Sequence, residues 1–407
     1  MVRMIKKSTS SIGKKRLYLG IVIFLLSCAM RLYFVIQNTD IPSSDAAVYD
    51  KLGLSLAETG GYTNSDGNPH SLYPPFYPFF LSIIYRIFGH NYLAVRIIQA
   101  IIGSFSCVLI YKIAAITIDN ATGIMASFFA LIYYPFIKGA GLLLTENLLV
   151  FLFLGTIFFI LKILKEDRLR HQITLGILLG LTVLTKSIML FFPFFLAPFF
   201  LFSSLKQCLN RYLVVMSFFI ITIFPWALRN FIVFGEFIPI SAESGFGLYS
   251  SYCPANGIFG LNAAPVDPIV VEAHKISSPS LRNRFFLKKT FQFILANPLR
   301  FLVLEFKKIV YFWAPFDWEI VGNKWFNIHY LLLLPFVAVG TVMAFKSFIN
   351  NCLILLPVIY FQVMTLIFYG SPRFRFLVEP YLFILAAIGV KKLRESIVSQ
   401  KMDIRDA

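Results

Sequence analysis

The chain has 407 residues, of which 58% are hydrophobic and only 14% are charged, and its net charge is +17. Soluble domains contain roughly 45–50% apolar and about 25% charged residues, so this composition excludes a soluble enzyme, a disordered protein and a disulfide scaffold. It indicates an all-α polytopic membrane protein, because apolar runs in lipid satisfy their backbone groups as helices. The lysines and arginines flank the apolar runs rather than forming one patch, as membrane topology requires, and they indicate no nucleic-acid partner.

The first apolar run extends from Leu17 to Ile36 and follows a strongly basic segment. A basic segment before an apolar run is also typical of a signal peptide, and Leu25 to Cys28 resembles a lipoprotein cleavage site. However, the run continues past Cys28 to a length that spans a bilayer, and more apolar runs follow. We therefore predict an uncleaved first span with a cytoplasmic N-terminus.

Further spans are predicted near residues 92–116, 122–139, 141–164, 172–187, 188–205, 211–229, 327–345, 351–369 and 375–391. Together they give about ten crossings, within a range of about nine to twelve, and both termini then lie in the cytoplasm with most of the short basic linkers. Two long loops, residues 37–91 and 230–326, then lie on the outer side of the cytoplasmic membrane. The whole chain, residues 1–407, is expected to form one transmembrane domain.

Each long loop contains a moderately apolar stretch, Pro75–Phe88 in the first and Phe301–Ala314 in the second. Both are short for a span, and the second has charged residues in its middle, so we predict helices that lie in the membrane interface. The polar residues concentrate at the outer edge of the membrane rather than at mid-span. Transporters usually show short loops, mid-membrane polar residues and repeated halves, so we expect chemistry at the outer surface instead.

Asp45 is the main candidate for this chemistry. Apolar residues at helical spacing predict a helix over residues 46–59, directly after Asp45. The carboxylate is either a simple helix cap or, if Ser43 or Ser44 provides the cap, a free group just beyond the first span. A free carboxylate in that position can act as the general base on a hydroxyl group.

A stiff aromatic stretch follows in the same loop: His70-Ser71-Leu72-Tyr73-Pro74-Pro75-Phe76-Tyr77-Pro78. Its rings either stack against a sugar or belong to the aromatic belt at the membrane interface. Glu146, near the outer end of a predicted span, is a functional candidate because ionisable groups within spans are costly. A structural ion pair with Lys138 or Lys186 is the alternative, and Lys186 can also simply extend its ammonium to the interface.

Three arginines lie at the outer ends of spans, against the positive-inside trend: Arg229, Arg373 and Arg375. An outer group of guanidinium side chains suits an anionic headgroup, since guanidinium binds phosphate in a bidentate manner. The alternative is attraction to bulk anionic lipid, which applies mainly to the basic residues of the second loop. The sequence contains neither a Cys-x-x-Cys pair nor a cluster of Cys and His that would indicate a metal site. We expect no cofactor.

The order of several motifs resembles a known family. These motifs are Asp45-x-x-x-Tyr49, Gly60-Gly61-Tyr62, Pro74-Pro75-x-Tyr77-Pro78, Leu184-Thr185-Lys186, Pro225-Trp226-x-x-Arg229-Asn230 and Arg373-Phe374-Arg375 followed by Glu379-Pro380. In this order and spacing they resemble bacterial members of glycosyltransferase family 39, in the GT-C superfamily. Relatives of that family include protein O-mannosyltransferases and the lipid A aminoarabinose transferase. The resemblance covers about residues 17–395.

The resemblance implies an inverting transferase that uses a polyprenyl-phosphate sugar on the outer face of the cytoplasmic membrane. The catalytic carboxylate of the family matches Asp45, and Tyr49 and Glu146 are expected to support it. Many relatives carry an Asp-Glu pair there, whereas this chain has Asp45-Ala46 and therefore one candidate base. The donor phosphate is expected to contact a set of residues from several spans and loops: Arg229, Arg373, Arg375, Lys186, His70 and Tyr73.

The acceptor hydroxyl belongs to a lipid, a glycan or a protein, and neither it nor the sugar follows from the sequence. Two other functions are possible for this architecture. One is a transporter or flippase of lipid-linked sugars, which the paucity of mid-span charge disfavours. The other is a membrane scaffold without catalytic activity, which the interfacial position of Asp45 disfavours.

Overall fold

The computed structural model describes residues 10–200, 205–252, 267–315, 326–368 and 370–406. Within these ranges the regular structure is helical apart from an isolated antiparallel bridge between Thr63 and Pro69. The helices are α1 (Ser10–Gln37), α2 (Asp45–Glu58), α3 (Phe76–Phe88), α4 (Tyr92–Thr117), α5 (Asn120–Ile132), α6 (Tyr134–Gly139), α7 (Thr145–Lys165), α8 (Leu169–Thr185), the 3₁₀ helix η2 (Ser187–Phe191), α9 (Phe192–Phe200), α10 (Leu205–Phe234), α11 (Ser244–Tyr252), α12 (Pro268–His274), α13 (Pro279–Ala296), α14 (Pro298–Trp313), α15 (Ile328–Lys346), α16 (Phe348–Ile367), α17 (Pro372–Arg375) and α18 (Glu379–Asp406).

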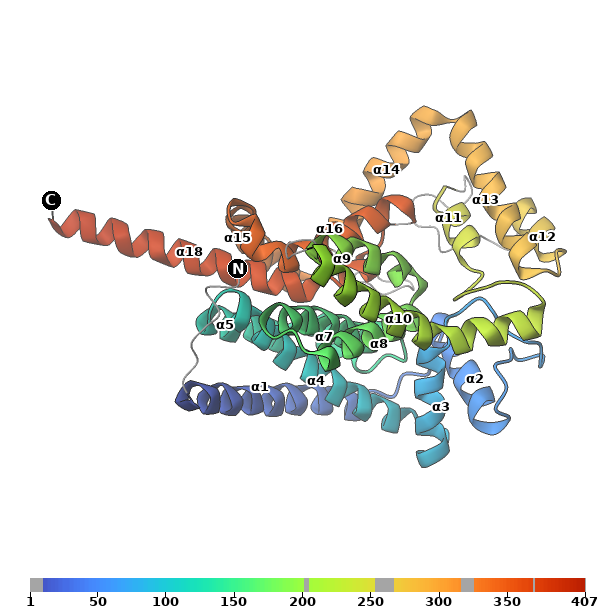
Figure 1. Ribbon diagram of the computed structural model, residues 1–407, viewed down its shortest axis with the longest axis horizontal. Helices are drawn as coiled ribbons and strands as arrows, with labels where there is room; N and C mark the ends of the chain where they lie inside the picture. The colour runs from blue at the N-terminus through green and yellow to red at the C-terminus, as the bar shows by residue number, and fades with distance from the viewer. Residues whose placement is uncertain (1–9, 201–204, 253–266, 316–325, 369, 407) are drawn as a thin grey trace.

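The long helices form one bundle with the loop helices at one end (Figure 1). The long helices pack side by side in pairs, with α1 on α4, α4 on α7, α7 on α8, α8 on α10, and α15 on α18. The helices α2, α3, α11, α12 and α13, which belong to the two predicted outer loops, lie at the right-hand end in Figure 1, whereas the start of α1 and the end of α18 lie at the left. The two long loops therefore share one end of the bundle.

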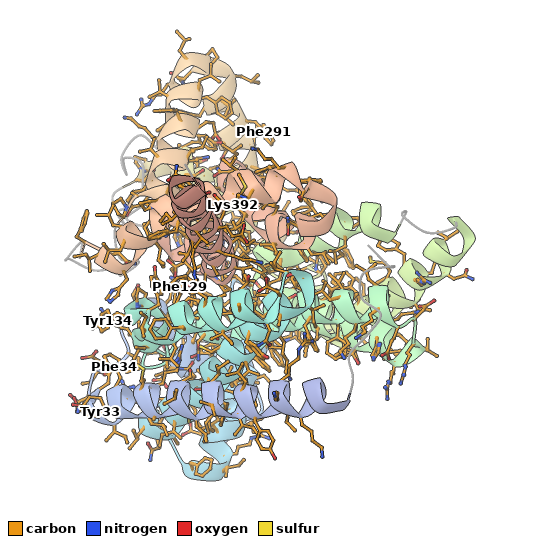
Figure 2. The ribbon with its side chains drawn as sticks, turned by 90° about the vertical axis from the view of Figure 1, so that its left-hand side faces the viewer. Tyr33, Phe34, Phe129, Tyr134, Phe291 and Lys392 are labelled. Atoms are coloured by element: carbon orange, nitrogen blue, oxygen red, sulfur yellow. The ribbon has the colours of Figure 1, made fainter. Side chains whose placement is uncertain are left out.

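Five described helices are long and apolar enough to cross a membrane: Lys14–Gln37, Tyr92–Thr117, Thr145–Lys165, Leu209–Phe234 and Ile328–Lys346. Five shorter apolar helices accompany them: Phe76–Phe88, Asn120–Ile132, Leu169–Thr185, Ser187–Ala197 and Asn351–Ile367. Large apolar side chains are exposed on the outside of the bundle, among them Tyr33 and Tyr134 (Figure 2), which suits a surface that faces lipid. These features confirm the predicted all-α membrane architecture, whereas the number of spans is only approximate.

One predicted span is interrupted, and a break in the helix lies near the boundary between two others. The segment 122–139 divides at Tyr133 into α5 and α6, because Pro135 in the first turn of α6 cannot continue the hydrogen bonding of α5. In the described residues, the predicted spans 172–187 and 188–205 correspond to α8, η2 and α9, and Lys186 between α8 and η2 is extended, with φ −152° and ψ 120°. Lys186 in this break belongs to the site described below.

The predicted loop helices are present with small shifts of their ends. The helix expected over residues 46–59 is α2, that over 75–88 is α3, and that over 301–314 is α14, which begins three residues earlier at Pro298. Many apolar side chains of α14 are exposed: Leu299, Leu302, Val303, Phe306 and Val310. Its position in the membrane interface stays a prediction.

Small residues allow close contact between the long helices. A Cβ atom placed at Gly180 of α8 would lie 2.5 Å from the Cβ of Thr222 on α10, and one at Gly176 would lie 2.5 Å from the carbonyl oxygen of Val215. The two glycines are four residues apart and so face the same neighbour. Such small-residue faces are typical of membrane helices, whose association depends on close packing.

Candidate active site

Asp45 is the first residue of α2, and its carboxylate does not cap the helix. Ser44 occupies the N-cap position, with φ 53°, but makes no side-chain capping hydrogen bond. The Asp45 carboxylate instead accepts hydrogen bonds from the hydroxyl of Tyr73 at 3.1 Å and from Nη1 of Arg373 at 2.6 Å. Asp45 is therefore held by residues 28 and 328 positions away in the chain.

Two polar networks fix the segment that carries Asp45. Arg96 of α4 donates to the carbonyl oxygens of Asn38, at 2.6 Å, and Asp40, in the link between α1 and α2. Asp50, one turn beyond Asp45 on α2, accepts hydrogen bonds from three rings of α3, α4 and their connection: Tyr85 at 2.6 Å, His90 at 2.7 Å and Tyr92 at 2.9 Å. The chain is thus anchored on both sides of Asp45.

Asp45 is one end of a line of alternating charges. Arg373, which binds Asp45, also donates from Nε to Oε1 of Glu146 at 2.5 Å, and Lys186 donates from Nζ to the same Glu146 oxygen at 2.7 Å. The Glu146 side chain is only 1% exposed, whereas that of Asp45 is 27% exposed. We call these four residues the charge cluster. The ion pair that the sequence offered as an alternative for Glu146 forms with Lys186.

Breaks in helices supply three members of the charge cluster. Glu146 is in the first turn of α7, where the helix dipole favours an anion. Lys186 lies in the extended break between α8 and η2, with its Nζ 5.1 Å from the ring centroid of Phe374. Arg373 lies on α17, a four-residue helix whose N-cap, Ser371, accepts from the Arg373 backbone N–H.

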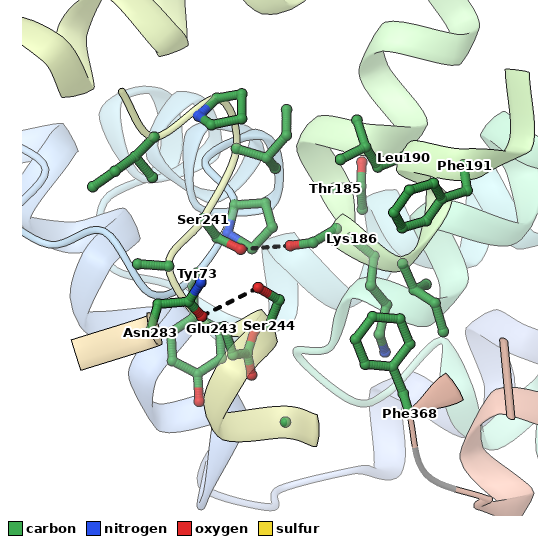
Figure 3. A pocket seen from close by; sticks show the side chains of 18 of the residues that line it. Tyr73, Thr185, Lys186, Leu190, Phe191, Ser241, Glu243, Ser244, Asn283 and Phe368 are labelled. Carbon is green, nitrogen blue, oxygen red and sulfur yellow. Dashed lines mark hydrogen bonds between the residues drawn. The ribbon is translucent and has the colours of Figure 1, made fainter. Parts of the chain in front are cut away.

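A cavity of about 360 Å³ opens beside the charge cluster, within the usual range of roughly 300–1,000 Å³ for ligand sites. Figure 3 shows loop-two residues and Tyr73 on one side of it, and Lys186, Phe191 and Phe368 on the other. The charged lining residues of this cavity are Asp45, Lys186, Glu243 and Arg373. The apolar residues next to Lys186 are Ile188, Leu190, Phe191 and Phe368.

Tyrosine side chains support Asp45 from loop one. The Tyr49 ring packs edge-on against those of Tyr73 and Tyr77, with centroids 5.2 and 5.3 Å apart. Burial and the neighbouring Asp45 raise the pKa of the Tyr73 phenol well above its usual range, so the hydroxyl keeps its proton and donates a hydrogen bond to the carboxylate. Tyr49 and Tyr73 both line the cavity.

Three of the residues predicted to contact phosphate lie outside this lining. His70 stacks on Tyr73, and burial, with Arg229 nearby, lowers its pKa to about 4, so the imidazole is neutral at pH 7. Arg229 donates to the carbonyl oxygens of His70 and Tyr62, each at 3.0 Å. Arg375 donates to Glu379 at 3.3 Å and lies over the Tyr330 ring, 3.8 Å from its centroid.

The structure therefore brings Asp45, Tyr49, Tyr73, Lys186 and Arg373 together around one cavity. Glu146 lies directly behind the two cations. The structure places Arg229 and Arg375 elsewhere, in contacts with backbone carbonyls, rings and Glu379. Within the described residues no group of three or more His, Cys, Asp or Glu side chains is arranged to hold a metal ion.

Sequence reasoning missed Glu243, in the second long loop. Its side chain lines the cavity, and burial, followed by repulsion from Asp45, raises its pKa to about 7. Nothing in the local sequence separates it from the other acidic residues of that loop. Only the folding of loop two onto loop one brings it to the cavity.

The family model described as dolichyl-phosphate-mannose-protein mannosyltransferase matches residues 73–228. This range contains Tyr73, Glu146 and Lys186 but neither Asp45 nor Arg373. No match was found among the curated proteins.

Among solved structures, the chain is similar to the oligosaccharyltransferase AglB from Archaeoglobus fulgidus in complex with an inhibitory peptide and a dolichol-phosphate. The TM-score is 0.60 at 13% identity, over 98% of this chain and 52% of that chain. The Archaeoglobus fulgidus oligosaccharyltransferase tethered to an acceptor peptide gives a TM-score of 0.60 at 14% identity, over 94% and 50% of the two chains. ArnT from Cupriavidus metallidurans bound to undecaprenyl phosphate gives 0.44 at 14% identity, over 94% and 77%.

The chain spans about half the length of the two oligosaccharyltransferase chains that it matches. At identities this low, a TM-score of 0.60 shows a shared fold. The shared part is the helical bundle described above, since nearly the whole of this chain is covered.

Proposed function

We propose that the chain is a membrane glycosyltransferase of the GT-C superfamily, which transfers a sugar from a polyprenyl-phosphate sugar to an acceptor hydroxyl; the family-model match over residues 73–228 and the shared fold support this. The reaction takes place on the outer face of the cytoplasmic membrane. The observation that carries this proposal is the cavity that joins a carboxylate, Asp45, to two cations, Lys186 and Arg373. A base and a phosphate site beside one another are what such a transfer requires.

Lys186 and Arg373 bind the donor phosphate. They are the cationic side chains that line the cavity among the described residues, and Arg373 offers a planar guanidinium suited to phosphate. The polyprenyl chain leaves this point along a groove that begins at Phe191 and Phe368 and is lined almost entirely by apolar side chains, among them Phe194, Phe195, Val363 and Met364.

Donor binding frees Asp45 to act as a base. In the empty site the two carboxylates and two cations of the charge cluster balance, and Arg373 is shared between Asp45 and Glu146. A phosphodiester adds one negative charge and competes for the guanidinium. Asp45 is the more exposed carboxylate, so it exchanges with the phosphate, while the buried Glu146 stays paired.

Asp45 then removes the proton of the acceptor hydroxyl as its oxygen attacks the anomeric carbon. The bond from the anomeric carbon to the phosphate oxygen breaks, and polyprenyl phosphate leaves with an additional negative charge. Arg373 and Lys186 stabilise that charge as it develops. Since this is one displacement, the configuration at the anomeric carbon inverts.

The test is a reconstituted assay with purified protein in liposomes and a panel of radiolabelled undecaprenyl-phosphate monosaccharides. Transfer to a membrane extract, with release of undecaprenyl phosphate, is expected from the wild type. Arg373→Lys should retain partial activity, because it keeps the charge but loses the bidentate geometry, and Arg373→Ala almost none. Movement of the intact lipid-linked sugar across the bilayer without transfer would refute the proposal and indicate a flippase.

A further inference from the structure

The part of loop two that lines the cavity is pinned to three other elements. The Ser241 hydroxyl hydrogen-bonds to that of Ser187 in η2 at 2.6 Å (Figure 3), and the Ala242 N–H donates to the carbonyl oxygen of Ser71 in loop one at 2.9 Å. On the other side, the Gly245 N–H donates to the Asn283 side chain of α13 at 2.5 Å. Residues 241–245 are therefore held on both sides of Glu243.

Within the described part of the chain, the Glu243 carboxylate has no hydrogen-bond or ion-pair partner. It is half-buried and lines the cavity. The charged and titratable groups that act on it are Asp45 of α2, Lys186 before η2, Arg373 of α17, and Tyr62 and Tyr73 of loop one. The backbone therefore presents a carboxylate with free acceptor oxygens to the cavity, where the hydroxyl groups of a ligand can donate to it.

The other sides of the cavity are already assigned in the proposed function. Lys186 and Arg373 take the phosphate, and Phe191 and Phe368 lead into the apolar groove that takes the lipid chain. The sugar is bonded to the phosphate and carries several hydroxyl groups. It therefore needs hydrogen-bond acceptors in the remaining, loop-two part of the lining, where Ser241, Glu243, Ser244 and Asn283 lie.

We propose that Glu243 recognises the sugar of the donor, by accepting hydrogen bonds from its hydroxyl groups opposite the phosphate site. Glu243 is thus a specificity-determining residue for the sugar, whereas Asp45 is the base. This inference rests on the proposed function, because it requires a polyprenyl-phosphate sugar in the cavity. The inference goes beyond the proposed function by assigning the sugar to the loop-two wall of the cavity and to one side chain.

The experiment compares binding of lipids with and without a sugar. Wild type, Glu243→Ala and Glu243→Gln are placed in nanodiscs and titrated with undecaprenyl phosphate and with its mannose, glucose, galactose and arabinose esters. Glu272→Gln is the matched control, because this loop-two carboxylate is 59% exposed and does not line the cavity. Thermal unfolding of each variant confirms that the protein measured is folded.

The wild type is expected to bind at least one sugar ester more tightly than undecaprenyl phosphate. Glu243→Ala should remove that gain, about 10- to 100-fold, which is the usual range for hydrogen bonds to a charged group. The affinity of this variant for undecaprenyl phosphate should stay the same or increase, because removing a negative charge from the cavity does not weaken the binding of an anion. Glu243→Gln keeps one acceptor oxygen and should lie between, and Glu272→Gln should match the wild type.

Other results would refute either the role of Glu243 or the proposed donor class. If Glu243→Ala weakens the binding of the sugar ester and of undecaprenyl phosphate equally, or weakens the binding of neither, Glu243 does not recognise the sugar. The same holds if its only effect in the transfer assay is on the KM of the acceptor. If the wild type binds undecaprenyl phosphate no better than undecaprenol, the donor class of the proposed function is wrong, and the role of Glu243 is refuted with it.

Discussion

Replacing Asp45 by Asn separates a catalytic carboxylate from a structural one. The substitution keeps the size of the side chain and one acceptor oxygen for the Tyr73 hydroxyl, and it removes the negative charge and the ability to take a proton. Asn also suits the start of a helix about as well as Asp. The backbone of α2 should therefore be unaffected.

The expected losses in rate and in stability differ widely. Removing a general base lowers a rate by about 10²- to 10⁴-fold, equivalent to about 3–5 kcal/mol of transition-state stabilisation. The Asp45 side chain is 27% exposed, and Arg373 keeps its hydrogen bond to Glu146. The charge cluster then carries one excess positive charge, but both cations keep their hydrogen bonds to Glu146 and the Asp45 side chain is partly open to solvent, so the free energy of unfolding should fall by only about 1 kcal/mol.

The assay measures kcat per folded molecule with the donor found in the panel, together with the melting temperature. Asp66→Asn is the control, because this loop-one carboxylate is exposed and does not line the cavity. It should leave both kcat and the melting temperature unchanged. An Asp45→Asn protein with the kcat of the wild type would refute the assignment of the base.

Four further predictions follow from the structure. Glu146→Gln removes the anion shared by two cations and should destabilise the protein by about 3–5 kcal/mol, visible as a lower melting temperature; an unchanged value would contradict the pairing. Gly180→Leu should cost about 1–3 kcal/mol by overpacking against Thr222, whereas Gly67→Ala, at an open turn, should strain only that turn. Asn64→Cys in a Cys253→Ser background should react with an impermeant thiol reagent on intact cells, and labelling only after membrane rupture would reverse the topology. Because the pKa of Glu243 is about 7, the carboxylate is lost as the pH falls below 7, so the donor KM should rise there, and Glu243→Gln should abolish this rise.

The predictions from sequence succeeded where one segment contained the whole signal. Helical spacing and the following glycines defined α2 to within one residue. The choice of Asp45 as the base rested on the family resemblance and stays a prediction. The pair of Glu146 and Lys186 was also within reach, because a buried charge near a span end requires a partner. The second inference depends on the local cost of burying a charge, since the Glu146 side chain is only 1% exposed.

The sequence was less informative where several residues of one type competed. Arg229, Arg373 and Arg375 all lie at outer span ends and carry the same charge, yet in the structure Arg373 alone among them lines the cavity. The direction of each side chain depends on breaks such as the short α17 and on carbonyls supplied by distant loops. Glu243 was missed for the same reason, since its position depends on contacts with η2, loop one and α13.

The shared carboxylate of Glu146 explains how two cations can remain in one wall of an empty cavity. The hydrogen bonds of 2.7 and 2.5 Å to the same oxygen place Nζ of Lys186 and Nε of Arg373 no more than about 5 Å apart. At an effective dielectric constant of about 20, two like charges at that distance repel by about 3 kcal/mol. Glu146 offsets this repulsion from a position that solvent does not reach, so it remains in place when the ligand changes. Asp45, which is more exposed and bound to a single nitrogen of Arg373, is then the group that responds to the donor, and the base becomes free only when the phosphate that must leave is already bound.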